Sequence, residues 1–258
     1  MAGFCKYFCT FVRMDDKLQQ IDTLLGELNQ YRANENYRIT EALEIEYTYD
    51  SNRIEGNTLT LHETDMVVNK GITIAGKGLR EHLEAINHKE AIDFIKDVAQ
   101  KKEPISERVL LDIHAIVLHS IDKDNAGKYR RVPVIISGSK HIPPQPYLLQ
   151  PKMDELFQWY EANKDSMHPV VLAAQMHEKL VSVHPFIDGN GRTARLVMNL
   201  ILMQHGYPIA NIKGDNETRR RYYETLEEAS SGDNSAFVEF IEDVVIQSLT
   251  YYLKIIRG

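Results

Sequence analysis

Residues 191–205 are the most restrictive stretch of the sequence, because apolar side chains cover most of the circumference of a predicted helix there. A helix of this kind has to lie inside the protein rather than on its surface. Gly206 and Pro208 follow the apolar run and are typical of a helix end. The sequence therefore predicts a fold built around one central helix, whose apolar positions are Ala194, Leu196, Val197, Leu200, Ile201 and Leu202.

Helical periodicity dominates the rest of the chain as well. The 258 residues are 43% hydrophobic, which is enough for a sizeable core. Thr60 and Glu63 have the spacing of a capping box, and Ser106 precedes another apolar repeat as an N-cap. We predict an all-α fold, with helices over 14–32, 39–56, from 60, 79–99, 106–121, and from about residues 151, 169, 191, 216 and 235.

One segment, "YRRVPVIISGSKHIPPQPYLL" at 129–149, departs from the helical rhythm. Its β-branched run is followed by a Gly138-Ser139 turn and a second short arm, which predicts one short β-hairpin. A hairpin edge can pair with an extended peptide, so the segment is a candidate flap for docking a protein. A surface excursion packed on helices remains the alternative. The candidate docking residues are Val134, Ile135, Ile136, His141 and Ile142.

Composition excludes several classes of function. The formal net charge is −7, with both signs mixed along the chain, so we expect no nucleic-acid partner. The only cysteines are Cys5 and Cys9, which predicts a reducing, cytoplasmic setting without disulfides. The apolar opening at 1–13 is too short for a membrane span and lacks a cleavage site, so we interpret it as an extension, with no membrane partner.

The residues before the central helix have the properties of an anion site. The free N–H groups of a helix's first turn carry partial positive charge, and Gly189 and Gly191 allow an anion to approach the backbone closely. Arg192 and Arg195 lie one turn apart and supply forked donors for phosphate oxygens. The pattern predicts a phosphate-binding helix N-terminus.

Two further residues suggest chemistry at that site. Asp188 would repel bare phosphate, but a divalent cation between them removes the conflict, since Mg²⁺ is held by carboxylates together with phosphate oxygens. His184 supplies a group that titrates near neutrality. Together they predict phosphoryl or nucleotidyl transfer, with His184 accepting a proton from the incoming hydroxyl.

The complete run from His184 to Arg195 resembles the Fic family signature, His-x-Phe-x-Asp/Glu-Gly-Asn-Gly-Arg-x-x-Arg, at every fixed position. The resemblance implies transfer of AMP from ATP to a Ser, Thr or Tyr hydroxyl of a target protein, with Mg²⁺ or Mn²⁺. It implies that His184 is the general base and that Asp188 holds the metal. The residues implied to bind the nucleotide phosphates are Gly189, Asn190, Gly191, Arg192 and Arg195.

The segment "SNRIEGN" at 51–57 resembles the inhibitory motif of many Fic proteins, Ser/Thr-x-x-x-Glu-Gly/Asn. Ser51, Glu55 and Gly56 occupy its fixed positions. A glutamate at a helix end is disfavoured by the helix dipole unless a cation is near. The resemblance implies that Glu55 pairs with Arg195 and keeps it from the ATP γ-phosphate.

The resemblance divides the chain into an N-terminal helical region at 14–103, which carries the inhibitory helix, and a catalytic core at 104–258. Tyr222 and Tyr223 are expected at the adenine pocket, although Ser230 stands where several members have Asn. Two alternatives stay open: hydrolytic removal of AMP with Glu55 orienting water, and a nucleotide-binding regulatory module with little turnover. Self-modification, the identity of the target and oligomer formation also stay open.

Overall fold

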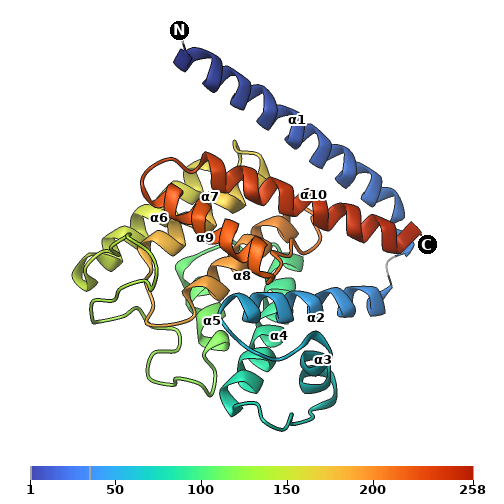
Figure 1. Cartoon of the computed structure of the whole chain (residues 1–258), viewed down its shortest axis with the longest axis vertical. Coiled ribbons are helices and arrows are strands. Elements are labelled where there is room, and N and C mark those ends of the chain that lie inside the picture. The colour runs from blue at the N-terminus through green and yellow to red at the C-terminus, as the bar shows by residue number, and fades with distance from the viewer. Residues whose placement is uncertain (1, 35, 258) are drawn as a thin grey trace.

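The architecture is a bundle of α-helices in a computed structural model that describes residues 2–34 and 36–257, with side chains from residue 16 except that of Asn34 (Figure 1). These residues include no β-strand. Two short 3₁₀ turns lie at Arg32–Asn34 and Pro146–Leu148. The helices are α1 (Ala2–Tyr31), α2 (Tyr37–Ile54), α3 (Leu61–Lys70), α4 (Leu79–Gln100), α5 (Glu107–Val117), α6 (Leu149–Asn163), α7 (Pro169–Val183), α8 (Asn190–Gln204), α9 (Asn216–Ser230) and α10 (Ser235–Arg257).

Helix α8 is the central helix that the apolar run predicted. Every side chain from Arg192 to Leu202 is buried, and α8 packs on α7, α4, α5 and α2. The main apolar core extends from Ile21 on α1 to Leu253 on α10. The N-terminal helices therefore share this core with the rest of the chain, and the division at residue 104 stays a prediction.

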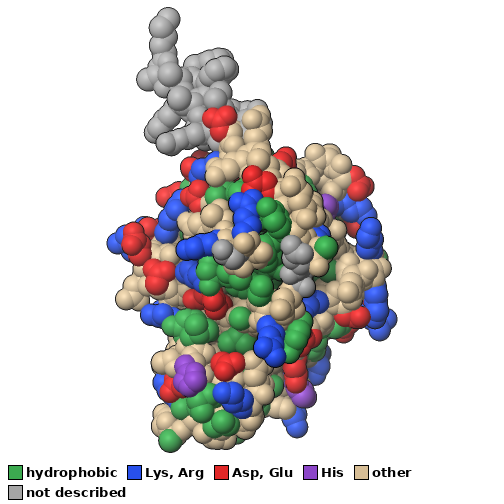
Figure 2. Space-filling model, turned by 90° about the vertical axis from the view of Figure 1, so that its right-hand side faces the viewer, with side chains coloured by type: hydrophobic (Ala, Val, Ile, Leu, Met, Phe, Trp, Pro, Cys, Tyr) green, Lys and Arg blue, Asp and Glu red, His purple; other side chains and the backbone are tan. Residues whose placement is uncertain are grey.

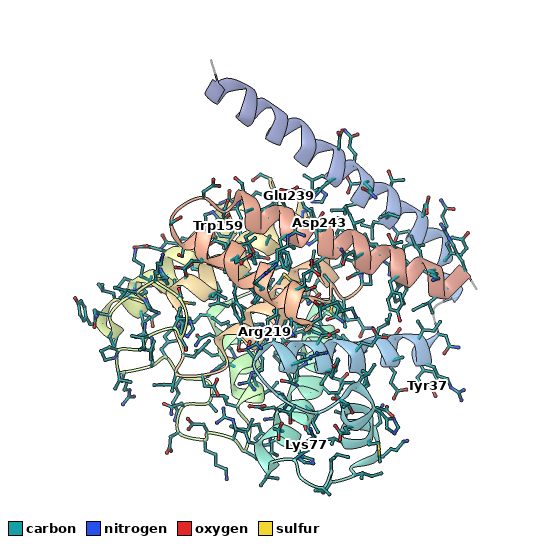
Figure 3. All side chains as sticks on the ribbon, in the orientation of Figure 1. Tyr37, Lys77, Trp159, Arg219, Glu239 and Asp243 are labelled. Carbon is teal, nitrogen blue, oxygen red and sulfur yellow. The ribbon has the colours of Figure 1, made fainter. Side chains whose placement is uncertain are left out.

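Helix α1 lies alongside α10 and runs in the same direction, while its first half projects away from the bundle (Figure 1). Lys17 forms ion pairs with Glu239, at 3.0 Å, and with Asp243, at 2.5 Å; both carboxylates lie on α10 (Figure 3). The predicted extension at 1–13 is helical from Ala2 onward, and its backbone forms the first part of α1. Its side chains, Cys5 and Cys9 included, lie outside the described residues.

Helix α2 is fixed against the segment that connects α8 to α9. The buried Asp50 carboxylate accepts hydrogen bonds from the Gly214 N–H at 2.9 Å, from Asn211 at 2.7 Å and from Lys213 at 3.1 Å. A Cβ at Gly214 would lie 2.9 Å from the Asp50 carbonyl oxygen, so only glycine allows this close packing. The C-terminal end of α2 is thereby held in front of α8.

The predicted hairpin is not confirmed, because the described residues 132–145 form a turn at Ser137-Gly138 but no strand. Pro133, Pro143 and Pro144 lack N–H groups, which removes donors from any ladder between the two arms. The arms are joined instead by Arg130, whose guanidinium donates to the carbonyls of Val132, at 3.1 Å, and Pro144, at 2.6 Å. We call residues 132–145 the flap segment.

Acidic and basic side chains are interspersed over the surface shown in Figure 2. In the basic run at 219–221, Arg220 lies 3.7 Å from Glu224 and Arg221 lies 2.9 Å from Asp243. These two arginines are therefore paired with carboxylates. Within the described part of the chain, no helix has the length and apolar character needed to cross a membrane.

Candidate active site

His184 lies at the C-terminal end of α7 in a left-handed conformation, with φ of 49°. Its backbone carbonyl accepts a hydrogen bond from Arg130 Nε at 2.8 Å. Ring Nδ1 lies 3.3 Å from the Val181 carbonyl, which can only accept, so the ring proton sits on Nδ1 and Nε2 keeps a free lone pair. Burial lowers the pKa of His184, which keeps the ring neutral and able to accept a proton.

The loop after His184 is closed by its own side chains. The Asn190 amide donates to the Phe186 carbonyl at 2.9 Å and accepts from the Phe186 N–H at 3.0 Å. The Asn190 side chain is thus committed to the loop, and only its backbone N–H is left for the predicted phosphate contact. Phe186 is fully buried and stacks on His114 at a centroid distance of 3.6 Å.

His114, which is buried on α5, is a candidate positioning residue for the site. Its Nδ1 accepts from the Gly127 N–H at 3.0 Å, so Nε2 carries the proton and donates to the Asp188 carbonyl at 3.0 Å. Burial lowers the pKa of His114 to about 4, which fixes this neutral tautomer. The ring therefore positions the backbone of the loop that carries Asp188.

The N-terminus of α8 has the backbone geometry that the predicted anion site requires. Gly189 caps the helix with φ of 78°, a left-handed conformation that favours glycine, and the first helical bond runs from Thr193 N to the Gly189 carbonyl. The N–H groups of residues 190–192 precede this ladder and have no helical acceptor. They can therefore donate to an anion in front of the helix.

Glu55, the C-cap residue of α2, reaches across to the same helix end. Its Oε1 lies 2.7 Å from Arg195 Nη2, the pairing that the resemblance implied. Arg195 also donates to Ser51 Oγ at 3.0 Å and to the Ser51 carbonyl at 2.9 Å. Burial opposes the charge of Arg195, but Glu55, Tyr222 and Tyr47 together more than offset this and raise the pKa of the guanidinium.

Gly191 makes the Glu55 contact sterically possible. A Cβ at this position would lie 2.4 Å from Glu55 Oε1 and 3.1 Å from Arg195 Nη1. Any larger residue would therefore displace the Glu55 carboxylate or the guanidinium. Glycine at 191 serves the approach of Glu55 as well as the predicted approach of phosphate.

Arg192 and Asp188 form a second charged group, separate from Glu55. Arg192 Nη2 lies 3.3 Å from Asp188 Oδ1, and its Nη1 lies 3.6 Å from Glu84 Oε1. Burial opposes ionisation of Asp188, but Arg192, the Gly189 N–H and Arg80 together lower the pKa of its carboxyl. The side chain of Asp188 is 40% exposed, and an ionised carboxylate is the kind of ligand that a hard cation takes.

A single-carboxylate site suits a cation that arrives with a nucleotide. The described residues contain no cluster of three His, Cys, Asp or Glu side chains that could hold a metal by themselves. Mg²⁺ commonly takes one or two carboxylates and completes its shell with phosphate oxygens and water. The donor set around Asp188 fits that mode of binding and not a metal site built from protein ligands alone.

A cavity of about 770 Å³ opens in front of the α8 N-terminus, and its walls include Glu55, His184, Gly191 and Ile136. Tyr222 and Tyr223 line it from α9, but they differ in role. Tyr222 is buried and bonds to Arg195 and His177, at 3.3 and 3.1 Å. Tyr223 is partly exposed, donates to the Ile54 carbonyl at 3.2 Å, and stacks under Arg219. Arg219 lies beside the C-terminal end of α2 (Figure 3).

The flap segment forms another wall of this cavity. Glu227 on α9 accepts hydrogen bonds from the Ser139 hydroxyl and from the Lys140 N–H, the latter at 2.9 Å. His141 is held at the Ser182 carbonyl at 2.7 Å, whereas Ile135 and Ile142 are largely exposed. The segment is therefore anchored at its tip and presents apolar side chains outward.

Comparisons with known proteins agree with this geometry. Residues 104–202 match the Fic/DOC family model. Proteins named "Protein adenylyltransferase Fic" are 36% identical over 244 residues in Nematostella vectensis and 40% identical over 211 residues in Culex quinquefasciatus. These alignments cover 93% and 81% of this chain but 55% and 41% of the relatives, so the chain spans about half the length of the curated relatives it matches.

A solved structure of Fic-1 from C. elegans is 32% identical and superposes with a TM-score of 0.83. That alignment covers 94% of this chain and 72% of the other. The likeness therefore extends from the signature motif to nearly the whole helical bundle. The chain belongs to the Fic/DOC family.

Proposed function

We propose that the chain transfers AMP from ATP to a Ser, Thr or Tyr hydroxyl of a target protein, with release of pyrophosphate. The observation that carries the proposal is the cavity in which the His184 ring, the α8 N-terminus and the Glu55–Arg195 pair meet. The names of the curated relatives, protein adenylyltransferase, support the same activity. ATP is therefore the proposed nucleotide substrate.

The proposed step uses His184 Nε2 as the base. The target hydroxyl oxygen bonds to the α-phosphorus, its proton passes to Nε2, and the bond between the α-phosphorus and the bridging oxygen breaks to release pyrophosphate. The N–H groups at the start of α8 and the guanidinium groups of Arg192 and Arg195 bind the phosphates. Asp188 would hold Mg²⁺ or Mn²⁺, which would neutralise phosphate charge when bound.

The Glu55–Arg195 pair is the proposed resting state. Glu55 and Ser51 take three of the five N–H donors of Arg195, so a γ-phosphate would have to displace the Glu55 carboxylate from the guanidinium. We assign the inhibitory role to Ser51, Glu55 and Gly56, the last of which ends the helix with φ of 97°. On this assignment, residues 14–103 regulate the core at 104–258.

Hydrolytic removal of AMP is a second candidate, because the Glu55 carboxylate lines the same cavity as His184. A carboxylate facing the α-phosphate can orient a water molecule as well as exclude the γ-phosphate. The two reactions predict opposite effects of replacing Glu55. Transfer increases when the carboxylate is lost, whereas hydrolysis decreases.

The proposed activity is tested with the Glu55→Gly chain, cell lysate, and ATP that carries its label on either the α- or the γ-phosphate. We expect protein-bound label from α-labelled ATP only, because AMP transfer retains the α-phosphate and releases the others as pyrophosphate. Label from the γ position would show phosphorylation instead. No protein-bound label in either reaction would contradict transfer.

The flap segment is proposed to hold the target backbone by strand pairing through Val134–Ile136 and His141-Ile142. Ile135 is 91% exposed, so its N–H can be removed without disturbing the core. We expect Ile135→Pro to lower protein modification severalfold and leave ATP affinity unchanged, because proline cannot donate to a paired strand. Ile135→Ala keeps the N–H and serves as the control. Equal rates for both variants would show that backbone pairing at this residue is not used.

A further inference from the structure

Arg80, in the first turn of α4, makes an ion pair with Asp188, which lies 108 residues further along the chain. A cation in the first turn of a helix opposes the helix dipole, so this position does not favour arginine by itself. Two carboxylates compensate for the unfavourable position. Arg80 Nη2 donates to Asp188 Oδ2, and Arg80 Nε donates to Glu84 Oε1 at 3.0 Å.

The contact leaves neither oxygen of Asp188 free. Oδ1 accepts from the Gly189 N–H at 2.6 Å and from Arg192 Nη2 at 3.3 Å, while Oδ2 accepts from Arg80. Arg192 is 2% exposed and cannot leave, but the Arg80 side chain is 60% exposed. Of the two guanidinium groups, only Arg80 can rotate into solvent and free an oxygen.

We propose that Arg80 is a removable counter-charge for Asp188. The Arg80 guanidinium must leave Asp188 Oδ2 before a divalent cation that accompanies the nucleotide binds to this oxygen. The inference rests on the proposed function, in which Asp188 holds that cation. It adds a second restraint, distinct from the Glu55–Arg195 pair. Glu55 keeps Arg195 from binding the γ-phosphate, and Arg80 keeps Asp188 from binding the metal.

The two restraints share a structural frame. Glu84 Oε1 accepts from Arg80, and its Oε2 accepts from Asn57 Nδ2 at 3.0 Å. Asn57 directly follows Gly56 and also donates to the Glu81 carbonyl at 3.0 Å. The chain segment that carries Glu55 is therefore tied to the turn of α4 that carries Arg80.

The test measures the Kd of α,β-methylene ATP by calorimetry in the Glu55→Gly chain, with Mg²⁺ and separately with EDTA. We expect Arg80→Gln to tighten binding with Mg²⁺ by about 2- to 5-fold, the range for an ion pair open to solvent. Binding with EDTA should not tighten, because no cation then competes for Asp188. With Asp188→Asn, the effect of Arg80→Gln should disappear.

Arg108→Gln is the matched control. Arg108 also occupies the second position of a helix, α5, and faces a carboxylate four residues on, Asp112, at 3.8 Å. It lies outside the cavity, so its replacement should leave both Kd values unchanged. Equal thermal unfolding of the variants would show that the fold is intact.

Unchanged or weaker Mg²⁺-dependent binding in Arg80→Gln would overturn the inference, and weaker binding would identify Arg80 as a phosphate ligand. AMP transfer is scored separately in the same preparations. AMP transfer together with an unchanged Kd in Arg80→Gln would contradict this inference alone. Nucleotide binding without AMP transfer would contradict the proposed function, and absence of nucleotide binding would contradict both.

Discussion

His184→Ala is expected to reduce AMP transfer by at least about 100-fold, because general-base catalysis by a positioned side chain contributes that much or more. ATP affinity should change little, since the loss acts on the chemical step rather than on phosphate binding. The measurement is the initial rate of AMP incorporation with the nucleotide Kd determined in parallel. His205→Ala, at the exposed far end of α8, is the control.

The pH dependence of the same rate follows from the buried ring. Burial lowers the pKa of His184 below the ordinary imidazole value, so the folded chain keeps a neutral base throughout the neutral range. The rate should stay constant near pH 7 and decline only when acid protonates the ring.

Substantial AMP transfer by His184→Ala would show that His184 is not the general base.

The central helix and the capped helix starts were predictable because their causes are local. Thr60 and Glu63 form the capping box that their spacing predicted, and α8 is buried as its apolar run required. The predicted helix over 106–121 ends earlier, at Val117, because a turn follows at Leu118. Local patterns predict the presence of an element better than its last residue.

The hairpin illustrates what a local pattern cannot supply. A β-branched run satisfies strand propensity, but a strand exists only where a second backbone pairs with it. Pro143 and Pro144 remove donors from the opposite arm, and Arg130 holds the two arms together through side-chain bonds. Pairing with a target backbone remains a prediction for this segment.

The spacing of Arg192 and Arg195 in the sequence does not predict that the two arginines have different carboxylate partners. Arg192 and Arg195 were expected to act together on the phosphates, yet one faces Asp188 and Glu84 while the other faces Ser51 and Glu55. Asp188 lies four residues before Arg192, but Glu84 comes from α4, and Ser51 and Glu55 come from α2 and its C-cap, far away in sequence. Tertiary packing therefore decides which carboxylate meets which guanidinium.

Glu55→Gly is expected to raise AMP transfer by roughly 10- to 150-fold, the equivalent of one charge-assisted hydrogen bond of about 1.5–3 kcal/mol. Loss of the carboxylate frees Arg195 for the γ-phosphate and opens the space beside Gly191. The better placement of the phosphates should also favour in-line attack by the hydroxyl. The rate is measured at matched ATP and Mg²⁺.

Two variants separate charge from general disturbance of α2. Glu55→Gln keeps the shape but removes the charge, so its increase in rate should be smaller than that of Glu55→Gly. Glu46→Gln removes a carboxylate from the same helix that faces Lys213 at 3.2 Å and not Arg195. Its rate should match the wild type, and an equal increase there would point to loosening of α2.

Inhibition by Glu55 through Arg195 is tested by a mass-spectrometric count of AMP on protein for four chains: wild type, Glu55→Gly, Arg195→Ala and the double variant. Both changes act through one contact, so they should not be additive. We predict that Glu55→Gly raises the rate strongly when Arg195 is present and loses most of that gain when it is replaced. Wild-type and Glu55→Gly rates that agree within error, or an equal gain without Arg195, would show that Glu55 does not inhibit transfer through Arg195.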